Sequence, residues 1–372
     1  MSDNLRRYCA IHSALLQQYP GGPTGNLARH LKTLAALVCG IVGSKKTHLP
    51  AIAGKVPDGR KRESRAKRFA RFLQNPSVTQ EAFFVPYAQA LVESLPAGPL
   101  VLIMDGSQIG RGCMALMVSV LYECQHQRGS QKRALPLCWQ VVNAKKGHFT
   151  QERHQQLLAQ ARQIIPTHRQ VIFLGDGEFD GPELLADVRA AGWHFACRTA
   201  KNVLLAESDW PDETFCLSDL GLQPGESMEL TDLLFTAQGL GPVLVGTVWE
   251  RGLTEPLLLV SSLDFLSEAR AWYRKRFSIE TFFSDQKSRG FYLCHSHLSQ
   301  SERLSRLLMA TCLAYYWMVC LGAEVVRCGW QAVVHRAKRC DLSLFQLGLI
   351  WLEHCLNEGW HPPVRLQVQT GK

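Results

Sequence analysis

Short apolar runs separated by polar, glycine-bearing turns predict a series of buried strands in the first half of the chain. These runs lie at 100–107, 114–123, 134–142, 170–176 and 193–198. Two stretches between them, 149–165 and 182–191, have the spacing of amphipathic helices. The expected order is therefore three strands, a helix, a strand, a helix and a strand. The first and fourth of these strands end near an aspartate, Asp105 and Asp176 respectively.

A second β-rich region is expected between 201 and 264, where the helical spacing disappears. Its strand-like runs are 229–235, 243–250 and 256–262, and turns that contain glycine separate them. We interpret this region as an insertion between two parts of the α/β core.

The stretch 266–290 predicts one helix of about six turns, with Ser267 as N-cap and Gly290 as the stop. At about 100° per residue, one edge of this helix carries four residues within an arc of about 60°. They are Tyr273, Arg276, Glu280 and Lys287. An apolar stripe of Trp272, Ile279, Phe282 and Phe283 lies beside this edge. A helix facing only solvent would carry similar charges, so the spacing by itself does not decide between a site and a surface.

The two ends of the chain also have helical patterns, at 26–41, 79–95 and 299–358. The uncharged run 307–323 is about as long as the shortest membrane-spanning helices. It contains Thr311, Gly322 and three adjacent aromatic residues, and we interpret it as a helix buried in a large core. We predict no association with a membrane.

The composition is that of a globular protein, and positive charge is concentrated in the first part of the chain. Of the net charge of +9, residues 1–75 carry +11, from fourteen Lys and Arg against three acids, and the remainder carries −2. The most basic stretch, 59–75, is amphipathic and predicts a helix-turn-helix-like DNA-binding unit with its neighbours. Its candidate DNA-binding residues are Arg60, Lys61, Arg62, Arg65 and Arg68. The alternative is a solvated face that binds nothing.

The thirteen cysteines form no C-x-x-C pair, which favours a reducing, cytoplasmic compartment over a disulfide framework. Cys294, His295 and His297 lie close together in the sequence. Because no second group of ligands has matching spacing, we predict no metal site there.

The spacing Y-x2-R-x3-E-x6-K, formed by Tyr273, Arg276, Glu280 and Lys287, resembles the motif of one large group of bacterial insertion-sequence transposases of the DDE type. In that group the glutamate is the last of three catalytic carboxylates. The order of strands and helices is that of a ribonuclease-H-like core, in which the first and fourth strands are neighbours. Asp105 and Asp176 are therefore expected to emerge together at one edge of the sheet.

The resemblance implies an α/β fold: a ribonuclease-H-like mixed sheet flanked by helices, interrupted by a β-rich insertion, with an N-terminal helical DNA-binding unit. Transposases with this motif are similar in carrying a β-rich insertion before the glutamate. The expected units are a DNA-binding region at 1–95, the core at 96–200 and 265–330, the insertion at 201–264 and a C-terminal helical region at 331–372.

Cleaving and joining a DNA backbone requires an activated oxygen nucleophile and a stabilised leaving oxygen. Two Mg²⁺ ions roughly 4 Å apart supply both, and carboxylate oxygens are their ligands. We expect Asp105, Asp176 and Glu280 to be catalytic and to bind the metal, with Mn²⁺ able to substitute. Glu178 would share the face of Asp176 in an extended strand end and is the alternative ligand.

The other motif residues are expected to bind DNA. Arg276 and Lys287 suit phosphate oxygens, and Tyr273 can donate its hydroxyl to a phosphate. In the transposases resembled, these residues hold the phosphate near a flipped-out nucleotide, which needs an aromatic platform. Trp249, in the insertion, is the candidate, with core packing as the alternative. Family members often carry tryptophan after the motif arginine, whereas this chain has Phe277.

The sequence thus predicts a DNA transposase that cleaves at the ends of an insertion element and joins the 3′-OH ends to target DNA. Its expected partners are terminal inverted-repeat DNA, target DNA and a second copy of the chain in a homodimer on DNA. It is expected in the bacterial cytoplasm, associated with the nucleoid. Two alternatives remain open: a ribonuclease-H-like, structure-specific nuclease, and a non-catalytic DNA-binding protein derived from a transposase.

Overall fold

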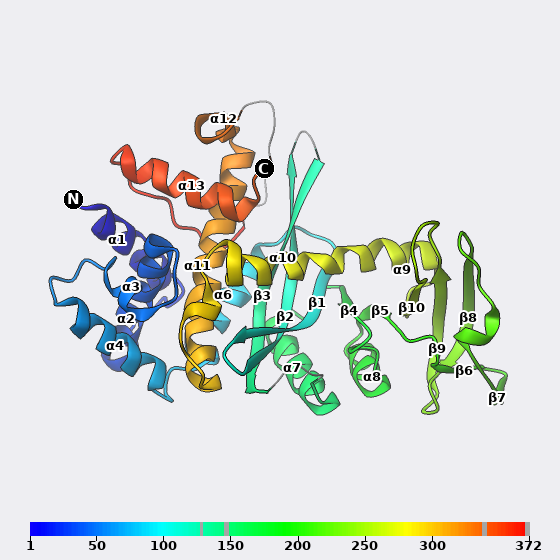
Figure 1. Ribbon diagram of the computed structural model, residues 1–372. Coiled ribbons are helices and arrows are strands. Elements are labelled where there is room, and N and C mark those ends of the chain that lie inside the picture. The colour runs from blue at the N-terminus through cyan, green and yellow to red at the C-terminus, as the bar shows by residue number, and fades with distance from the viewer. Residues whose placement is uncertain (127–128, 145–148, 337–340, 369–372) are drawn as a thin grey trace.

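A computed structural model describes residues 1–126, 129–144, 149–336 and 341–368 (Figure 1). The strands are β1 (Leu100–Gly110), β2 (Cys113–His126), β3 (Gly129–Asn143), β4 (Val171–Gly175), β5 (His194–Arg198), β6 (Leu204–Glu207), β7 (Trp210–Cys216), β8 (Ser227–Phe235), β9 (Leu240–Val248) and β10 (Leu257–Ser261). The α-helices are α1 (Asp3–Leu16), α2 (Gly25–Ser44), α3 (Leu49–Ala53), α4 (Arg62–Gln74), α5 (Gln80–Phe83), α6 (Val85–Ser94), α7 (Gln151–Ile164), α8 (Pro182–Ala190), α9 (Leu266–Tyr273), α10 (Ser278–Ser284), α11 (Ser301–Arg327), α12 (Gln331–Val334) and α13 (Leu344–Asn357). Short 3₁₀ or π turns are η1 (Leu217–Leu220), η2 (Arg274–Phe277), η3 (Asp285–Arg289) and η4 (Leu293–His295).

The first five strands form the ribonuclease-H-like half of the sheet, in the order β3-β2-β1-β4-β5. β1 pairs antiparallel with β2 and parallel with β4, and β4 pairs parallel with β5. Every residue of β4 is buried, as expected for a parallel strand covered on both faces. The register sets Ile103 opposite Leu174 at the end of the parallel pairing. The residues that follow on the two strands therefore lie at the same edge. The predicted fold class and strand neighbourhood are confirmed.

The remaining strands continue the same sheet instead of forming a separate one. β10 pairs antiparallel with β5, and the order then runs β9, β8, β6 and β7 toward the far end of the molecule (Figure 1). β8, β9 and β10 fall where the apolar pattern predicts them. β6 and β7 were not predicted, because β7 is mostly exposed and its residues lack the alternation that marks a half-buried strand.

The stretch 266–290 is not the uniform helix that the sequence predicts. The 3₁₀ turn η2 separates α9 from α10, and the π-helical turn η3 ends the segment before Gly290. The N-cap is Phe265, not Ser267. The N–H of Leu266, which has no partner within the helix, donates to the carboxylate of Glu229 at 2.7 Å. The 3₁₀ turn coincides with the charged run 274–277, which has no buried residue to hold a regular register.

Helix α11 packs against both the sheet and the helices from the two ends of the chain. It contacts β3, α13 and the N-terminal helices α2 and α4. The guanidinium of Arg306 donates to the carbonyls of Leu73 and Val78, which ties the N-terminal helices to it. The N-terminal region therefore shares the main hydrophobic core of the protein.

Two helices of the described residues, α2 and α11, are long and apolar enough to cross a membrane by length and composition. In α11, which contains the predicted apolar run, 89% of the apolar window is buried inside the fold. Each cysteine that the structure describes is free, and Cys340 lies outside the described residues.

Candidate active site

Asp105 and Asp176 occupy adjacent positions on neighbouring parallel strands. Asp105 lies in β1, and Asp176 directly follows β4. Each carboxylate accepts one local backbone hydrogen bond: Asp105 Oδ1 from the N–H of Gly106 at 2.7 Å, and Asp176 Oδ1 from the N–H of Glu178 at 3.0 Å. These bonds fix the two side chains just beyond the point where the parallel pairing of β1 with β4 ends.

Glu280 reaches the same place from α10. Asp105, Asp176 and Glu280 line one pocket together with Arg276 and Lys287. The other lining residues are Gly106, Ser107, Phe283, Ser284 and Ser288. Residues from three distant parts of the sequence thus meet in one concave site.

The guanidinium of Arg276 lies between two of the carboxylates. One terminal nitrogen is 3.3 Å from Asp105 Oδ2, and the other is 3.0 Å from Glu280 Oε1. Its carbon lies 5.9 Å from the centre of the Tyr273 ring. The side chains of Asp105 and Arg276 are 14% and 15% exposed, whereas that of Glu280 is 44% exposed, so the ion pair with Asp105 is the better shielded from water.

Lys287 is held at the pocket by the π-helical turn. It donates a hydrogen bond to the hydroxyl of Ser107, and its amino group lies 5.6 Å from the centre of the Phe283 ring. Burial lowers the pKa of Lys287, while the thiol of Cys294 and the carboxylate of Asp105 raise it. Sequence analysis did not identify Ser107, although its position two residues after Asp105 on a strand gives it the same face.

Burial dominates the electrostatics of Asp105 and raises its pKa to about 6. The nearby Arg276 opposes this shift, and the carboxylates of Asp176 and Glu280 add to it. A site with several carboxylates and a desolvated aspartate needs positive charge to be stable in its ionised form. In this structure Arg276 supplies that charge.

The chemistry of the three carboxylates suits a hard divalent cation, because oxygen is the ligand that Mg²⁺ and Mn²⁺ share in proteins. The side chains do not form such a site in the positions that they occupy here. Within the described ranges, no three His, Cys, Asp or Glu side chains are close enough together to hold a metal ion. The guanidinium of Arg276 lies between Asp105 and Glu280 and contacts one oxygen of each.

Glu178, the alternative ligand, is engaged in a different contact. Its Oε1 accepts the N–H of Phe149 at 2.6 Å and lies 3.5 Å from Nε2 of the buried His154. The ring of Phe149 in turn approaches Gly106 so closely that a Cβ there would be 2.8 Å away from it. Glu178 therefore anchors the loop beside Asp105, and it is not among the residues that line the pocket.

Trp249, the predicted aromatic platform, and Phe277 both lie outside the pocket lining. The indole N–H of Trp249 donates to the carbonyl of Leu253 at 2.9 Å, which fixes the side chain in the turn after β9. Phe277 is 62% exposed and directly follows Arg276 in the sequence. An apolar ring this exposed is available for a partner.

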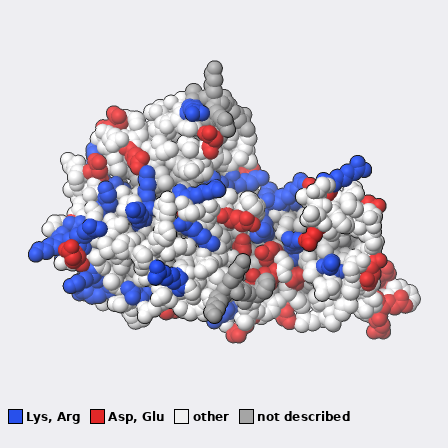
Figure 2. Space-filling model, in the orientation of Figure 1, with Lys and Arg blue, Asp and Glu red and all other residues white. Residues whose placement is uncertain are grey.

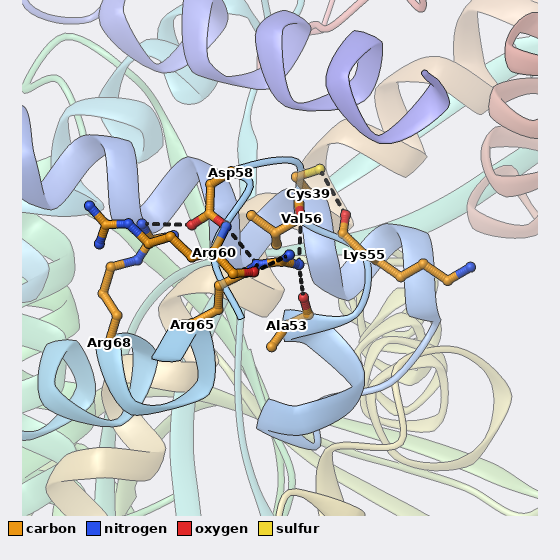
Figure 3. Close-up of polar contacts among 8 residues, drawn as sticks. All are labelled: Cys39, Ala53, Lys55, Val56, Asp58, Arg60, Arg65 and Arg68. Atoms are coloured by element: carbon orange, nitrogen blue, oxygen red, sulfur yellow. Dashed lines mark hydrogen bonds and ion pairs between the residues drawn. The ribbon is translucent and has the colours of Figure 1, made fainter. Parts of the chain in front are cut away.

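Of the five predicted DNA-binding residues near α4, Arg65 has a structural role (Figure 3). It donates to the carbonyls of Ala53, Val56 and Arg60 and pairs with Asp58 at 2.6 Å. Arg68 pairs with the same carboxylate at 3.1 Å, and Arg62 donates to the carbonyl of Pro50 at 2.7 Å. Among these five residues of the described structure, Arg60 and Lys61 alone are exposed and make no such side-chain contact.

Charge is unevenly distributed over the face shown in Figure 2. Lys and Arg gather around α4 and along the line of α9 and α10, whereas Asp and Glu gather at the tip of β6 and β7. Arg276 and Lys287, which line the pocket, belong to the turns at the two ends of α10 and so to this basic band. A band of this kind attracts a polyanion to the pocket.

Cys294, His295 and His297 belong to a neighbouring feature. His295 and His297 line a pocket with Lys46, Thr47, His48 and Tyr292. The rings of His48 and His297 are in edge contact, with centroids 5.1 Å apart. This pocket therefore gathers three histidine rings beside Tyr292.

A family model described as a transposase DDE domain matches residues 127–317. The search of curated proteins found no match. One similar solved structure is a piggyBac transposase synaptic complex with hairpin DNA, at 10% identity and a TM-score of 0.48, with 96% of this chain and 81% of the other covered. Another is Drosophila Piwi, at 12% identity and a TM-score of 0.26, with 76% and 46% covered. Because the family model spans more than half of the sequence, the chain belongs to the transposase DDE domain family.

Proposed function

We propose that this DNA transposase cleaves DNA at the ends of an insertion element and joins the freed 3′-OH ends to target DNA. The observation that carries the proposal is the shared pocket of Asp105, Asp176 and Glu280, with Arg276 and Lys287 on its wall. Carboxylates for metal ions and cations for phosphate are the two components that phosphoryl transfer needs.

The three carboxylates would hold two Mg²⁺ ions, with Mn²⁺ as a substitute. When bound, such ions activate the attacking oxygen and stabilise the leaving 3′ oxygen. Lys287 provides a point charge for a phosphate oxygen, and Arg276 provides a planar fork that binds two such oxygens. Tyr273 supports Arg276 through the face of its ring.

The partners follow from this chemistry. We propose that the basic band holds the terminal inverted repeats of the element, with Arg60 and Lys61 at its N-terminal end, and that target DNA reaches the same pocket. A homodimer on DNA would pair two element ends, and the free thiols suit the reducing bacterial cytoplasm. An aromatic contact for an unstacked base would come from the exposed Phe277 more readily than from Trp249.

A test of this function separates cleavage from DNA binding. Asp105→Asn, Asp176→Asn and Glu280→Gln should each abolish Mg²⁺-dependent cleavage of a labelled duplex that carries the element end. Binding of the same duplex, measured by fluorescence anisotropy in EDTA, should remain. Glu178→Gln is the matched control, because an amide oxygen can still accept the N–H of Phe149. Cleavage that survives any of the three substitutions, or is lost in the control alone, would remove the proposed site.

A nuclease of the same fold that cuts without joining is the second candidate. Pre-cut element ends bypass cleavage, so incubating them with supercoiled target DNA and Mg²⁺ tests joining directly. Joined products support a transposase. Cleavage without joined products would instead assign the pocket to a structure-specific nuclease.

A further inference from the structure

Arg276 occupies a position that the proposed metal site also needs. Its two terminal nitrogens contact Asp105 Oδ2 and Glu280 Oε1, which are oxygens from two of the three carboxylates. We propose that Arg276 is an internal counter-ion that holds these carboxylates in the metal-free protein and leaves them when a DNA phosphate binds it. DNA binding and metal binding would then favour each other. This inference rests on the proposed two-metal function.

The counter-ion role follows from burial and charge. Asp105 is largely buried, and its pocket contains two further carboxylates. Without a cation, these groups would repel one another in a partly desolvated site. A guanidinium that bridges two of them offsets part of this charge, in addition to the nearby Lys287, and holds the two carboxylates in position by directed hydrogen bonds.

The same geometry makes the guanidinium a competitor of the metal. An Mg²⁺ ion binds carboxylate oxygens at about 2.0–2.1 Å. One oxygen of Asp105, Oδ2, and one of Glu280, Oε1, are at present contacted by Arg276. Two cations cannot share so small a space without strong repulsion, so Arg276 has to move before an ion binds there.

Arg276 belongs to the 3₁₀ turn η2, which contains no buried residue to anchor it, so the contacts with Asp105, Glu280 and the Tyr273 ring hold its side chain in place. Its neighbours on that turn face other partners. Arg274 pairs with Glu250 at 2.6 Å, and Lys275 lies 4.0 Å from the centre of the Trp272 ring. Arg276 is therefore the member of the run Arg274–Arg276 that is directed into the pocket.

A phosphate is the group that can draw Arg276 away. Guanidinium binds phosphate in the same bidentate manner as carboxylate, and a phosphodiester arrives with charge of its own. Once the guanidinium has turned to the phosphate, the oxygens of Asp105 and Glu280 are available. Because binding free energies are linked, the metal must then favour DNA binding by the same factor by which DNA favours metal binding.

The experiment measures Mn²⁺ binding, not activity. Free Mn²⁺ is followed by its electron paramagnetic resonance signal in titrations of the full chain, with and without a short pre-cut duplex end. In the wild-type protein, DNA should tighten Mn²⁺ binding by about fivefold or more. In Arg276→Ala, Mn²⁺ should bind at least about fivefold tighter than wild type without DNA, and DNA should add little. Arg276→Gln, which keeps the shape and loses the charge, should behave like the alanine variant.

Arg274→Ala is the matched control, since it removes a guanidinium from the same turn that pairs with Glu250 outside the pocket. It should retain both the wild-type Mn²⁺ affinity and the coupling to DNA. If the two Arg276 variants bind Mn²⁺ no tighter than wild type, the counter-ion role is wrong. The proposed function fails separately, if Asp105→Asn and Glu280→Gln leave Mn²⁺ binding unchanged.

Discussion

The amino group of Lys287 donates a hydrogen bond to the hydroxyl of Ser107, which stands two residues after Asp105 on β1. This contact joins the π-helical end of the Glu280 segment to the strand that carries the first aspartate. It holds a cation beside the carboxylates without placing it between them, in contrast to Arg276.

From this contact we predict unequal effects of removing its two members. Lys287→Ala should lower the rate of DNA cleavage by about a hundredfold or more, because a preorganised cation at the reacting phosphate is lost. Ser107→Ala removes only the support of the lysine and should cost far less. Single-turnover cleavage rates with saturating DNA measure both. Equal losses in the two variants would mean that Lys287 acts through β1 and not on the phosphate.

The basic residues near α4 should separate into structural and DNA-binding groups. Arg65→Ala removes donors to three carbonyls and the ion pair with Asp58, and should lower the free energy of unfolding by about 2–4 kcal/mol. Lys61→Ala should leave stability within about 0.5 kcal/mol.

The same two variants should differ in the opposite sense in DNA binding. Lys61→Ala should reduce the slope of log affinity against log salt by about 1, as expected when one phosphate contact is lost. Thermal unfolding and anisotropy titrations over a range of NaCl concentrations measure the two properties. A wild-type salt slope in Lys61→Ala would exclude this residue from the DNA interface.

The pH dependence of stability should contain a contribution from Asp285. Burial raises the pKa of this carboxyl to about 6, and Arg133 and Arg289 only partly oppose the shift. The folded protein therefore holds the proton more tightly than the unfolded chain, in which the pKa is near 3.8. The stability due to protonated Asp285 is full below about pH 4 and is lost as the pH rises through about 6.

Asp285→Asn removes this titration. Its stability relative to wild type should increase between pH 4 and 6 by about 1–3 kcal/mol and then level off. Urea unfolding at several pH values in EDTA gives the difference curve. A difference that stays constant with pH would show that the carboxyl does not titrate with a raised pKa.

The crossing of α11 and α13 should tolerate no side chain at its two glycines. A Cβ on Gly322 would lie 1.8 Å from the carbonyl oxygen of Leu344, and one on Gly348 would lie 1.9 Å from that of Met318. Since backbone atoms cannot turn aside as side chains do, Gly322→Ala or Gly348→Ala should destabilise the protein by about 3 kcal/mol. Gly21→Ala, where the added Cβ meets nothing within 4 Å, is the control, and thermal unfolding compares the three.

Local patterns in the sequence were sufficient for the core strands and for the choice of candidate residues. The runs 100–104 and 171–175 are apolar because both faces are buried, so the points where they stop, directly before Asp105 and Asp176, can be located without a structure. The spacing of Tyr273, Arg276, Glu280 and Lys287 is likewise readable, because residues on one helix edge recur at fixed intervals.

Other features depend on partners that are distant in the sequence. Whether the inserted strands continue the sheet is decided by the pairing of β10 with β5, and backbone hydrogen bonds carry no mark in the side-chain pattern. The pattern of basic residues does not distinguish Arg65, which donates to backbone carbonyls, from Arg60 and Lys61. A positive charge in the sequence does not reveal which group will accept its hydrogen bonds.

The sequence by itself therefore determined the type of core, the excess of positive charge in its first part and the candidate acids and bases that line the pocket. The tertiary structure alone decided how these groups meet: a 3₁₀ turn and a π turn replace the regular helix, and the guanidinium of Arg276 comes to lie between Asp105 and Glu280. The reason is physical. Burial leaves a periodic pattern along the chain, whereas helix irregularities and ion pairs arise from packing and electrostatic contacts between segments that the chain brings together only on folding.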